Sequence, residues 1–137
     1  MSISLLAHIE QASAQFAQAQ IALGQGTLSY ADEAAWLVLW AAGLPPDTDC
    51  NSAEFANSAA NTAPSAALEE KISALIALRI SSRQPTAYLT QEAWLQGVPF
   101  FVDQRSIVPR SLIAEIIAHG SADAWLDPQA TRALDLC

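Results

Sequence analysis

The side chains that could act chemically in this sequence are few, and their spacing assembles no recognisable catalytic site. His8 and His119 lie far apart, with no other His or Cys close to either in sequence. We therefore expect surface or helix-end histidines rather than metal ligands. The adjacent pairs Asp32–Glu33 and Glu69–Glu70 point to different faces of a helix, which predicts helix caps and solvated charge rather than a general acid–base pair. The sequence contains no glycine-rich phosphate loop, zinc-protease motif or nucleophile elbow.

The cysteines and the apolar runs indicate in which cellular compartment the protein is expected. Cys50 and Cys137 are too few for a disulfide framework and form no Cys-x-x-Cys pair. The first residues lack the basic segment of a secretory signal, so we expect two free thiols in a reducing cytoplasm. The longest apolar run, 34–44, is too short to span a bilayer, which needs about 20 residues, so no membrane contact is expected.

Composition predicts a folded core with an uneven charge. The 137 residues are 52% hydrophobic and 15% charged, which is typical of one packed domain or one domain with an appendage. The net charge is −8, and all Lys and Arg lie from Lys71 onward. The first half is therefore a poor candidate for direct nucleic-acid binding. Its acidic surface either favours a basic partner or keeps an alanine-rich protein soluble, and composition leaves both interpretations open.

Hydrophobic periodicity predicts long helices over 4–23, 29–42 and 65–82, and a short one near 52–59. Ser29 is the expected N-cap of the second helix, in which apolar residues cover most sides and predict a central position. Gly24 and Gly43 follow the first two helices, where glycine favours a left-handed cap. In the third helix Arg79, like the other charged residues, is expected to lie largely off the apolar stripe.

In the second half of the chain the sequence pattern predicts short strands and turns as well as helices. After a turn or two of helix at 85–89, the segments 92–95 and 98–102 flank Gln96–Gly97, which predicts a β-hairpin with Pro99 at an edge position. Ser111 is the expected N-cap of an apolar helix that stops at Gly120. The last six residues, 132–137, read as a buried strand, and one strand cannot make a sheet. We therefore expect a chain cut within a larger α/β enzyme, with the four tryptophans as core or interface anchors: Trp36, Trp40, Trp94 and Trp125.

Several segments resemble one enzyme family. They are 83–89 (Arg-Gln-Pro-Thr-Ala-Tyr-Leu), 94–102 (Trp-Leu-Gln-Gly-Val-Pro-Phe-Phe-Val) and 108–111 (Val-Pro-Arg-Ser), supported by 32–37 and 44–46. This pattern is similar to the HemK-type protein glutamine N5-methyltransferases. Two branches act on peptide release factors and on large-subunit ribosomal protein three. The segment 111–115 is similar to the ribosomal-protein branch, although that branch usually has Pro where Leu112 stands and Phe where Leu95 stands.

The resemblance implies a mainly α fold class with three parts. A helical substrate-recognition bundle would span 1–84, a β-hairpin linker 85–110, and the start of a truncated Rossmann-like domain that binds S-adenosylmethionine 111–137. Residues 134–137 would be its first strand, with Asp135 at the edge of a cofactor loop that lies outside this sequence. The family's Asn-Pro-Pro-Tyr catalytic motif is also absent from this sequence, so we expect the isolated chain to be inactive.

The resemblance also implies a place for the substrate. Pro109, Arg110 and Ser111 would lie near the mouth of the active site and shape the channel that admits the substrate loop. For Arg110 the alternative is an ion pair with Glu115 beside the helix start, and for the hairpin it is a purely structural role. The implied partner is a basic ribosomal protein. The competing functions are the same chemistry on a release factor and a non-catalytic helical adaptor.

Overall fold

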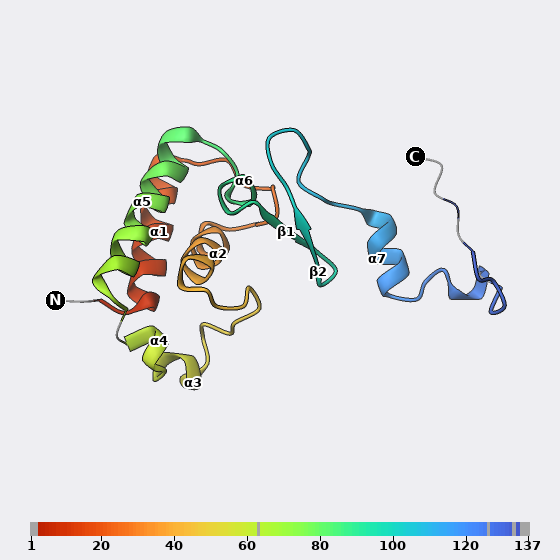
Figure 1. Cartoon of the computed structure of the whole chain (residues 1–137), viewed down its shortest axis with the longest axis horizontal. Coiled ribbons are helices and arrows are strands. Elements are labelled where there is room, and N and C mark those ends of the chain that lie inside the picture. Colours follow the sequence, from red (N-terminus) through yellow and green to blue (C-terminus); the bar gives the residue numbers. More distant parts are fainter. Residues whose placement is uncertain (1–2, 63, 126, 133, 135–137) are drawn as a thin grey trace.

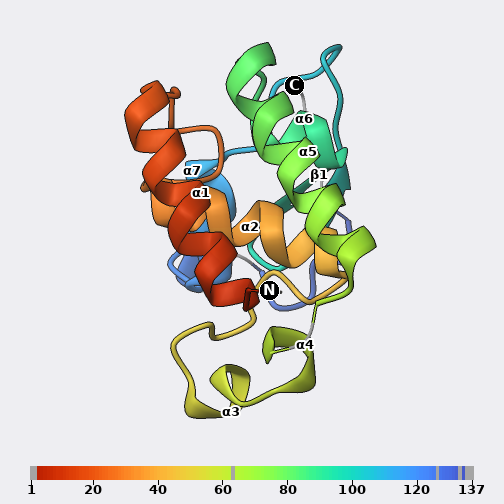
Figure 2. The same ribbon diagram turned by 90° about the vertical axis from the view of Figure 1, so that its left-hand side faces the viewer.

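The helical body of the chain is built from three long helices. In a computed structural model, which describes residues 3–62, 64–125, 127–132 and 134, these are α1 (Leu5–Ala19), α2 (Tyr30–Ala42) and α5 (Ala66–Ser82). Figure 1 shows α1 and α5 side by side at one end of the molecule, and Figure 2 shows α2 lying behind and between them. The central position expected for α2 is confirmed, since it packs against both α1 and α5.

Serine caps set the beginnings of these helices. In each, the serine hydroxyl accepts the backbone N–H three residues further along, which satisfies one of the unpaired donors of the first turn: Ser4, Ser29 and Ser65. The N-cap predicted at Ser29 is therefore confirmed. The interior faces of the helices bury a continuous apolar core, to which α1 contributes Leu5, Ile9 and Phe16 and α5 contributes Ile72 and Ile76.

The first helix ends earlier than predicted, at Ala19 rather than near residue 23. Gln20 adopts a left-handed conformation with φ 49°, and the N–H of Ile21 donates to the carbonyl of Phe16. This is a Schellman cap, in which the apolar residue after the cap packs back onto the last turns. Ile21 and Phe16 are both in the core. Burial of Ile21 therefore outweighs the cost of a left-handed non-glycine residue and ends the helix before the glycines.

Two short helices occupy the region where one was predicted: α3 (Ala53–Ala56) and α4 (Ala59–Thr62). Ser58 separates them, because its hydroxyl accepts the N–H of Asn61 at 3.1 Å in the manner of a cap. The buried side chain of Asn61 accepts from the N–H of Leu6 at 2.9 Å and donates to the carbonyl of Ala56 at 2.8 Å. These bonds fasten α4 to the first turn of α1.

The predicted hairpin is confirmed. A short helix α6 (Thr86–Thr90) leads into β1 (Glu92–Leu95), which pairs antiparallel with β2 (Val98–Phe101). The turn residues Gln96 and Gly97 have φ 49° and 77°, the pair of positive angles that a two-residue turn between twisted strands requires. Pro99 pairs with Trp94 in a sheet that has only these two strands within the described residues, so the expected edge position is confirmed.

The last described part extends away from the helical body. Helix α7 (Leu112–Ala118) is followed by a 3₁₀ turn, η1 (Asp123–Trp125), and Figure 1 shows both beyond the hairpin. Ser111 caps α7, as predicted, by accepting the N–H of Ala114 at 3.2 Å. No residue of α7 is buried, and its large apolar side chains are between 48% and 77% exposed. In the strand predicted over 132–137, Arg132 and Leu134 have no strand structure, and the other residues lie outside the described part.

Candidate functional site

A groove of about 550 Å³ separates α2 from the hairpin. One wall is the face of α2 that carries Asp32 and Trp36, and the loop 46–51 continues that wall. The opposite wall comes from Ala93, Trp94 and Gly97 of the hairpin, together with the segment 108–109. The region from Gly26 to Asn51 thus forms one concave surface with the hairpin and the segment 108–109, which are distant from it in sequence, and we call this surface the acidic groove. Concave, largely apolar sites with a few polar groups are where proteins most often bind ligands.

The acidic groove carries negative charge, and no positively charged residue is part of its lining. Its lining includes three exposed carboxylates, those of Asp32, Asp47 and Asp49, and no Lys or Arg. An oxygen of Asp49 accepts the N–H of Asn51 at 2.9 Å. Within the described ranges, no donor or cation pairs with the side chains of Asp32 or Asp47. The two carboxylates are therefore available to a cationic ligand.

Two tryptophans give the acidic groove its aromatic surface. The side chain of Trp94 is 42% exposed, and its indole N–H donates to Glu92 on the same strand. Trp36 is half-buried against the turn before α2, where a Cβ on Gly26 would lie 3.1 Å from its ring. Its indole N–H is buried and has no acceptor among the described residues. An unpaired buried donor costs about 1–3 kcal/mol.

Cys50 is the nucleophilic side chain of the acidic groove, and its surroundings make it a weak one. Burial, followed by the negative charge of Asp49, raises the pKa of the Cys50 thiol. Because the thiolate is the reactive form, a raised pKa keeps the group protonated and inert near neutral pH. No group of three or more His, Cys, Asp and Glu that could hold a metal ion occurs in the described part of the chain. The acidic groove is thus arranged for binding rather than for bond breaking.

The residues predicted to line a substrate channel do not lie together in the structure. Pro109 lines the acidic groove, whereas Arg110 and Ser111 do not. Arg110 is exposed, and the alternative ion pair with Glu115 is absent between these two described side chains. Ser111 acts as the cap of α7. Asp135, predicted beside the cofactor, lies outside the described residues. The sequence reasoning missed the contribution of the loop 46–51, although the absence of basic residues before Lys71 was a signal of it.

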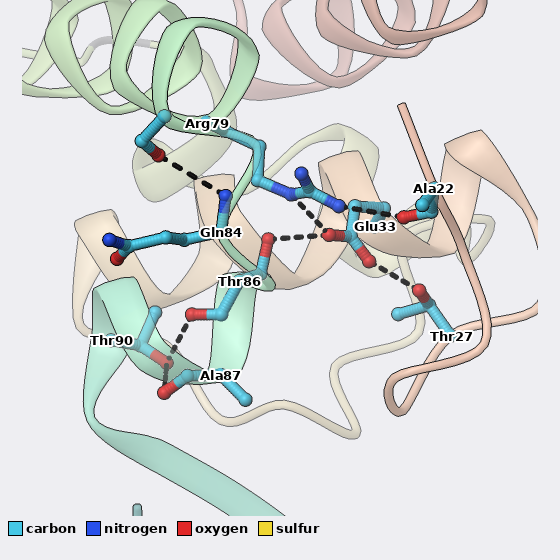
Figure 3. A network of polar contacts seen from close by, with 9 residues as sticks. Ala22, Thr27, Glu33, Arg79, Gln84, Thr86, Ala87 and Thr90 are labelled. Carbon is cyan, nitrogen blue, oxygen red and sulfur yellow. Dashed lines mark hydrogen bonds and ion pairs between the residues drawn. The ribbon is translucent and has the colours of Figure 1, made fainter. Parts of the chain in front are cut away.

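Beside the acidic groove lies a buried polar network that corrects two predictions. Glu33, predicted in solvent, is 3% exposed, and Arg79, predicted off the core, is 2% exposed. Figure 3 shows them joined, with the Arg79 Nε donating to the Glu33 Oε1 at 2.7 Å. The hydroxyls of Thr86 and Thr27 donate to the same carboxylate, and the guanidinium also donates to the carbonyl of Ala22 at 2.9 Å. Mutual neutralisation and these hydrogen bonds explain why two charged groups are found inside.

A third correction concerns His8, which lies in the first turn of α1 but is buried rather than on the surface. Only 8% of it is exposed, and its Nε2 lies 3.9 Å from an oxygen of Glu69. His119, in contrast, caps the end of α7 and is exposed, as predicted. None of the helices in the described part is both long and apolar enough to cross a membrane.

Comparison with known proteins identifies similar sequences with a common name. The chain is 45% identical over 130 residues to a protein of Bordetella pertussis named ribosomal protein uL3 glutamine methyltransferase, with 94% of the chain and 41% of the relative covered. Proteins of the same name from Burkholderia pseudomallei and Bradyrhizobium diazoefficiens are 39% and 35% identical, covering 94% and 98% of the chain and 40% and 42% of the relatives. No family model matches the chain, and no solved structure matches it.

These relatives confirm the resemblance that the sequence carries. The chain is similar along nearly its whole length to proteins named uL3 glutamine methyltransferases, and it spans about 40% of the length of these curated relatives. The ribosomal-protein branch, favoured by the segment 111–115, is the branch that the names of these relatives give.

Proposed function

We propose that this chain is the substrate-recognising part of a larger cytoplasmic methyltransferase that modifies a glutamine side chain of ribosomal protein uL3. The observation that carries the proposal is the 35–45% identity to three uL3 glutamine methyltransferases over at least 94% of the chain. In this proposal residues 1–84 are the helical recognition domain and 85–110 the hairpin linker. Residues 111–137 begin the domain that holds the cofactor.

The exposed apolar surfaces support this division. Every residue of β2 is exposed, and α7 presents four large apolar side chains to solvent: Leu112, Ile113, Ile116 and Ile117. Contiguous apolar surface of this kind marks a site of further packing. We assign that packing to the remaining part of the larger protein, since the chain accounts for only about 40% of the relatives' length.

The reaction needs more than the described residues provide. An amide nitrogen is a poor nucleophile because its lone pair is delocalised into the carbonyl, so most of the protein's contribution would be to orient it. S-adenosylmethionine would supply an activated methyl group. Within the described residues no strand is followed by a glycine-rich turn and a helix, the arrangement that holds a nucleoside in Rossmann-type folds, so these residues do not fit the cofactor. We therefore assign the cofactor to the remaining part of the larger protein.

Methyl transfer by the full-length protein tests the proposal. The protein would be incubated with methyl-labelled S-adenosylmethionine and either purified uL3 or a peptide release factor. We expect label on uL3, at a glutamine identified by peptide mass spectrometry, and little on the release factor. Label on the release factor alone would assign the chain to the release-factor branch. Label on neither protein would favour a non-catalytic adaptor.

A second measurement concerns the 137-residue chain by itself. We expect no heat of S-adenosylmethionine binding in calorimetry and no methyl transfer, because the described residues offer no site for the cofactor. Micromolar affinity would contradict the assignment of the cofactor to another part of the protein.

A further inference from the structure

We propose that the acidic groove binds an extended, basic segment of the substrate protein, with an arginine or lysine side chain seated between its carboxylates and Trp94. This inference rests on the proposed function and adds to it the surface that takes the substrate and the chemistry that it recognises. The family resemblance assigned the substrate channel to 109–111, whereas the acidic groove is formed mainly by α2, the loop 46–51 and the hairpin.

Charge is the first argument. Asp32 in the first turn of α2 and Asp47 in the following loop are exposed, and neither has a partner among the described residues. No Lys or Arg lines the acidic groove, and none occurs before Lys71 in the sequence. A cationic side chain that enters therefore displaces no existing ion pair. Potentials of opposite sign across an interface speed the encounter and select the partner.

The aromatic surface is the second argument. Trp94 is 42% exposed on the wall opposite α2. A guanidinium or ammonium group is attracted to the face of an indole ring, and the side-chain stem of Arg or Lys packs on apolar surface while its charge stays near water. The lining provides that apolar surface in Ala35 and Leu39. The carboxylates of the groove thus suit the charged end of an Arg or Lys side chain, and the indole and the apolar lining suit its aliphatic stem.

Other occupants fit this surface less well. The phosphates of a nucleic acid would be repelled by three carboxylates that no cation of the lining offsets. A wholly apolar segment would cover the charges of Asp32 and Asp47 without pairing them, which is costly. A basic segment pairs with both carboxylates.

The position of the acidic groove suits delivery of the substrate. Pro109 is part of its lining and lies three residues before α7 begins. In the proposed function α7 opens the cofactor-binding part. A segment held in the acidic groove would therefore be anchored beside the junction of the two parts, and the reactive glutamine could lie further along the same polypeptide.

Two matched charge variants of the full-length protein test the inference. Asp32→Asn with Asp47→Asn removes two charges from the acidic groove, whereas Glu10→Gln with Glu70→Gln removes two exposed charges from outside it. With uL3 as substrate at low ionic strength, we expect the first pair to raise KM about tenfold with kcat unchanged, and the second to change KM less than about twofold. In high salt the two variants should converge, because exposed charges are screened. Equal KM values for the two variants at low salt, raised or not, would overturn the inference.

A peptide arm separates this inference from the proposed function. If the unmodified protein transfers no methyl group to uL3, the proposed function fails, and the acidic groove is then tested with a hexa-arginine peptide and a hexa-glutamate control by tryptophan fluorescence. We expect only the arginine peptide to bind, about tenfold more weakly to the Asp32/Asp47 variant than to the Glu10/Glu70 variant. Binding of both peptides, of neither, or with equal affinity to the two variants would overturn the inference.

Discussion

The buried pair of Glu33 and Arg79 gives the sharpest test of the fold. Replacing Glu33 by Gln keeps the shape of the side chain and its capacity for hydrogen bonds with the threonine hydroxyls, but it removes the charge that neutralises Arg79. The guanidinium is 2% exposed, and its Nη1 already lacks a partner among the described residues. An uncompensated buried charge costs about 3–5 kcal/mol. That is a large share of the roughly 5–15 kcal/mol that holds a domain folded.

Urea denaturation followed by tryptophan fluorescence measures this cost. With a slope of about 2 kcal/mol per molar urea, typical of a small domain, a loss of about 3 kcal/mol lowers the midpoint by about 1.5 M. The control Glu70→Gln removes an exposed charge and should change stability by less than about 0.5 kcal/mol. Adding Arg79→Met to Glu33→Gln removes the orphaned charge and should recover much of the loss. If Glu33→Gln and Glu70→Gln have the same midpoint, the guanidinium has access to water and the reasoning is wrong.

Three further predictions concern a cap, a turn and a thiol. Ser29→Ala removes the acceptor for the first turn of α2 and should lower the free energy of unfolding by about 1 kcal/mol in the same urea assay. Gly97→Ala should cost about 1–2 kcal/mol, because φ is 77° while a Cβ there would meet no atom within 4 Å, so a fully tolerated substitution would contradict the turn conformation. In a Cys137→Ser background, the pH midpoint for alkylation of Cys50 should lie higher in the folded chain than in urea, since burial and then Asp49 raise its pKa. Asp49→Asn should lower the folded midpoint, and no change would contradict the charge effect.

The fold could be predicted wherever the signals were local. Serine caps, the Gln96–Gly97 turn and the apolar stripes act within a few residues, and the structure confirms the elements that they indicated. The end of α1 was misplaced because it depends on Ile21 packing back onto Phe16, a contact that outweighs the glycines further along. Local pattern could not reveal it, since the gain from burying Ile21 depends on the rest of the core.

The candidate site was less predictable for the same reason. The resemblance predicted Pro109 at a substrate channel, and Pro109 lines the acidic groove, but the other walls come from α2, the loop 46–51 and the hairpin. These segments come together only in the tertiary structure, so the spacing of residues in the sequence could not predict that they form one surface. The charge asymmetry of the first half was compatible with a basic partner or with a solubilising surface, and it gave no position for a binding site.

Asp32 and Glu33 are neighbours on α2, but one lines the candidate binding surface and the other is buried in the core. Adjacent residues point about 100° apart around a helix, so one carboxylate faces the acidic groove while its neighbour enters the core. The buried one joins α2 to α5 through Arg79 and to α6 through Thr86, as Figure 3 shows. Because β1 begins two residues after α6 ends, this network also fixes the hairpin relative to α2. The Glu33 carboxylate therefore holds the two walls of the acidic groove in position. Loss of the Glu33–Arg79 pair should let the hairpin move relative to α2 before the helical body unfolds.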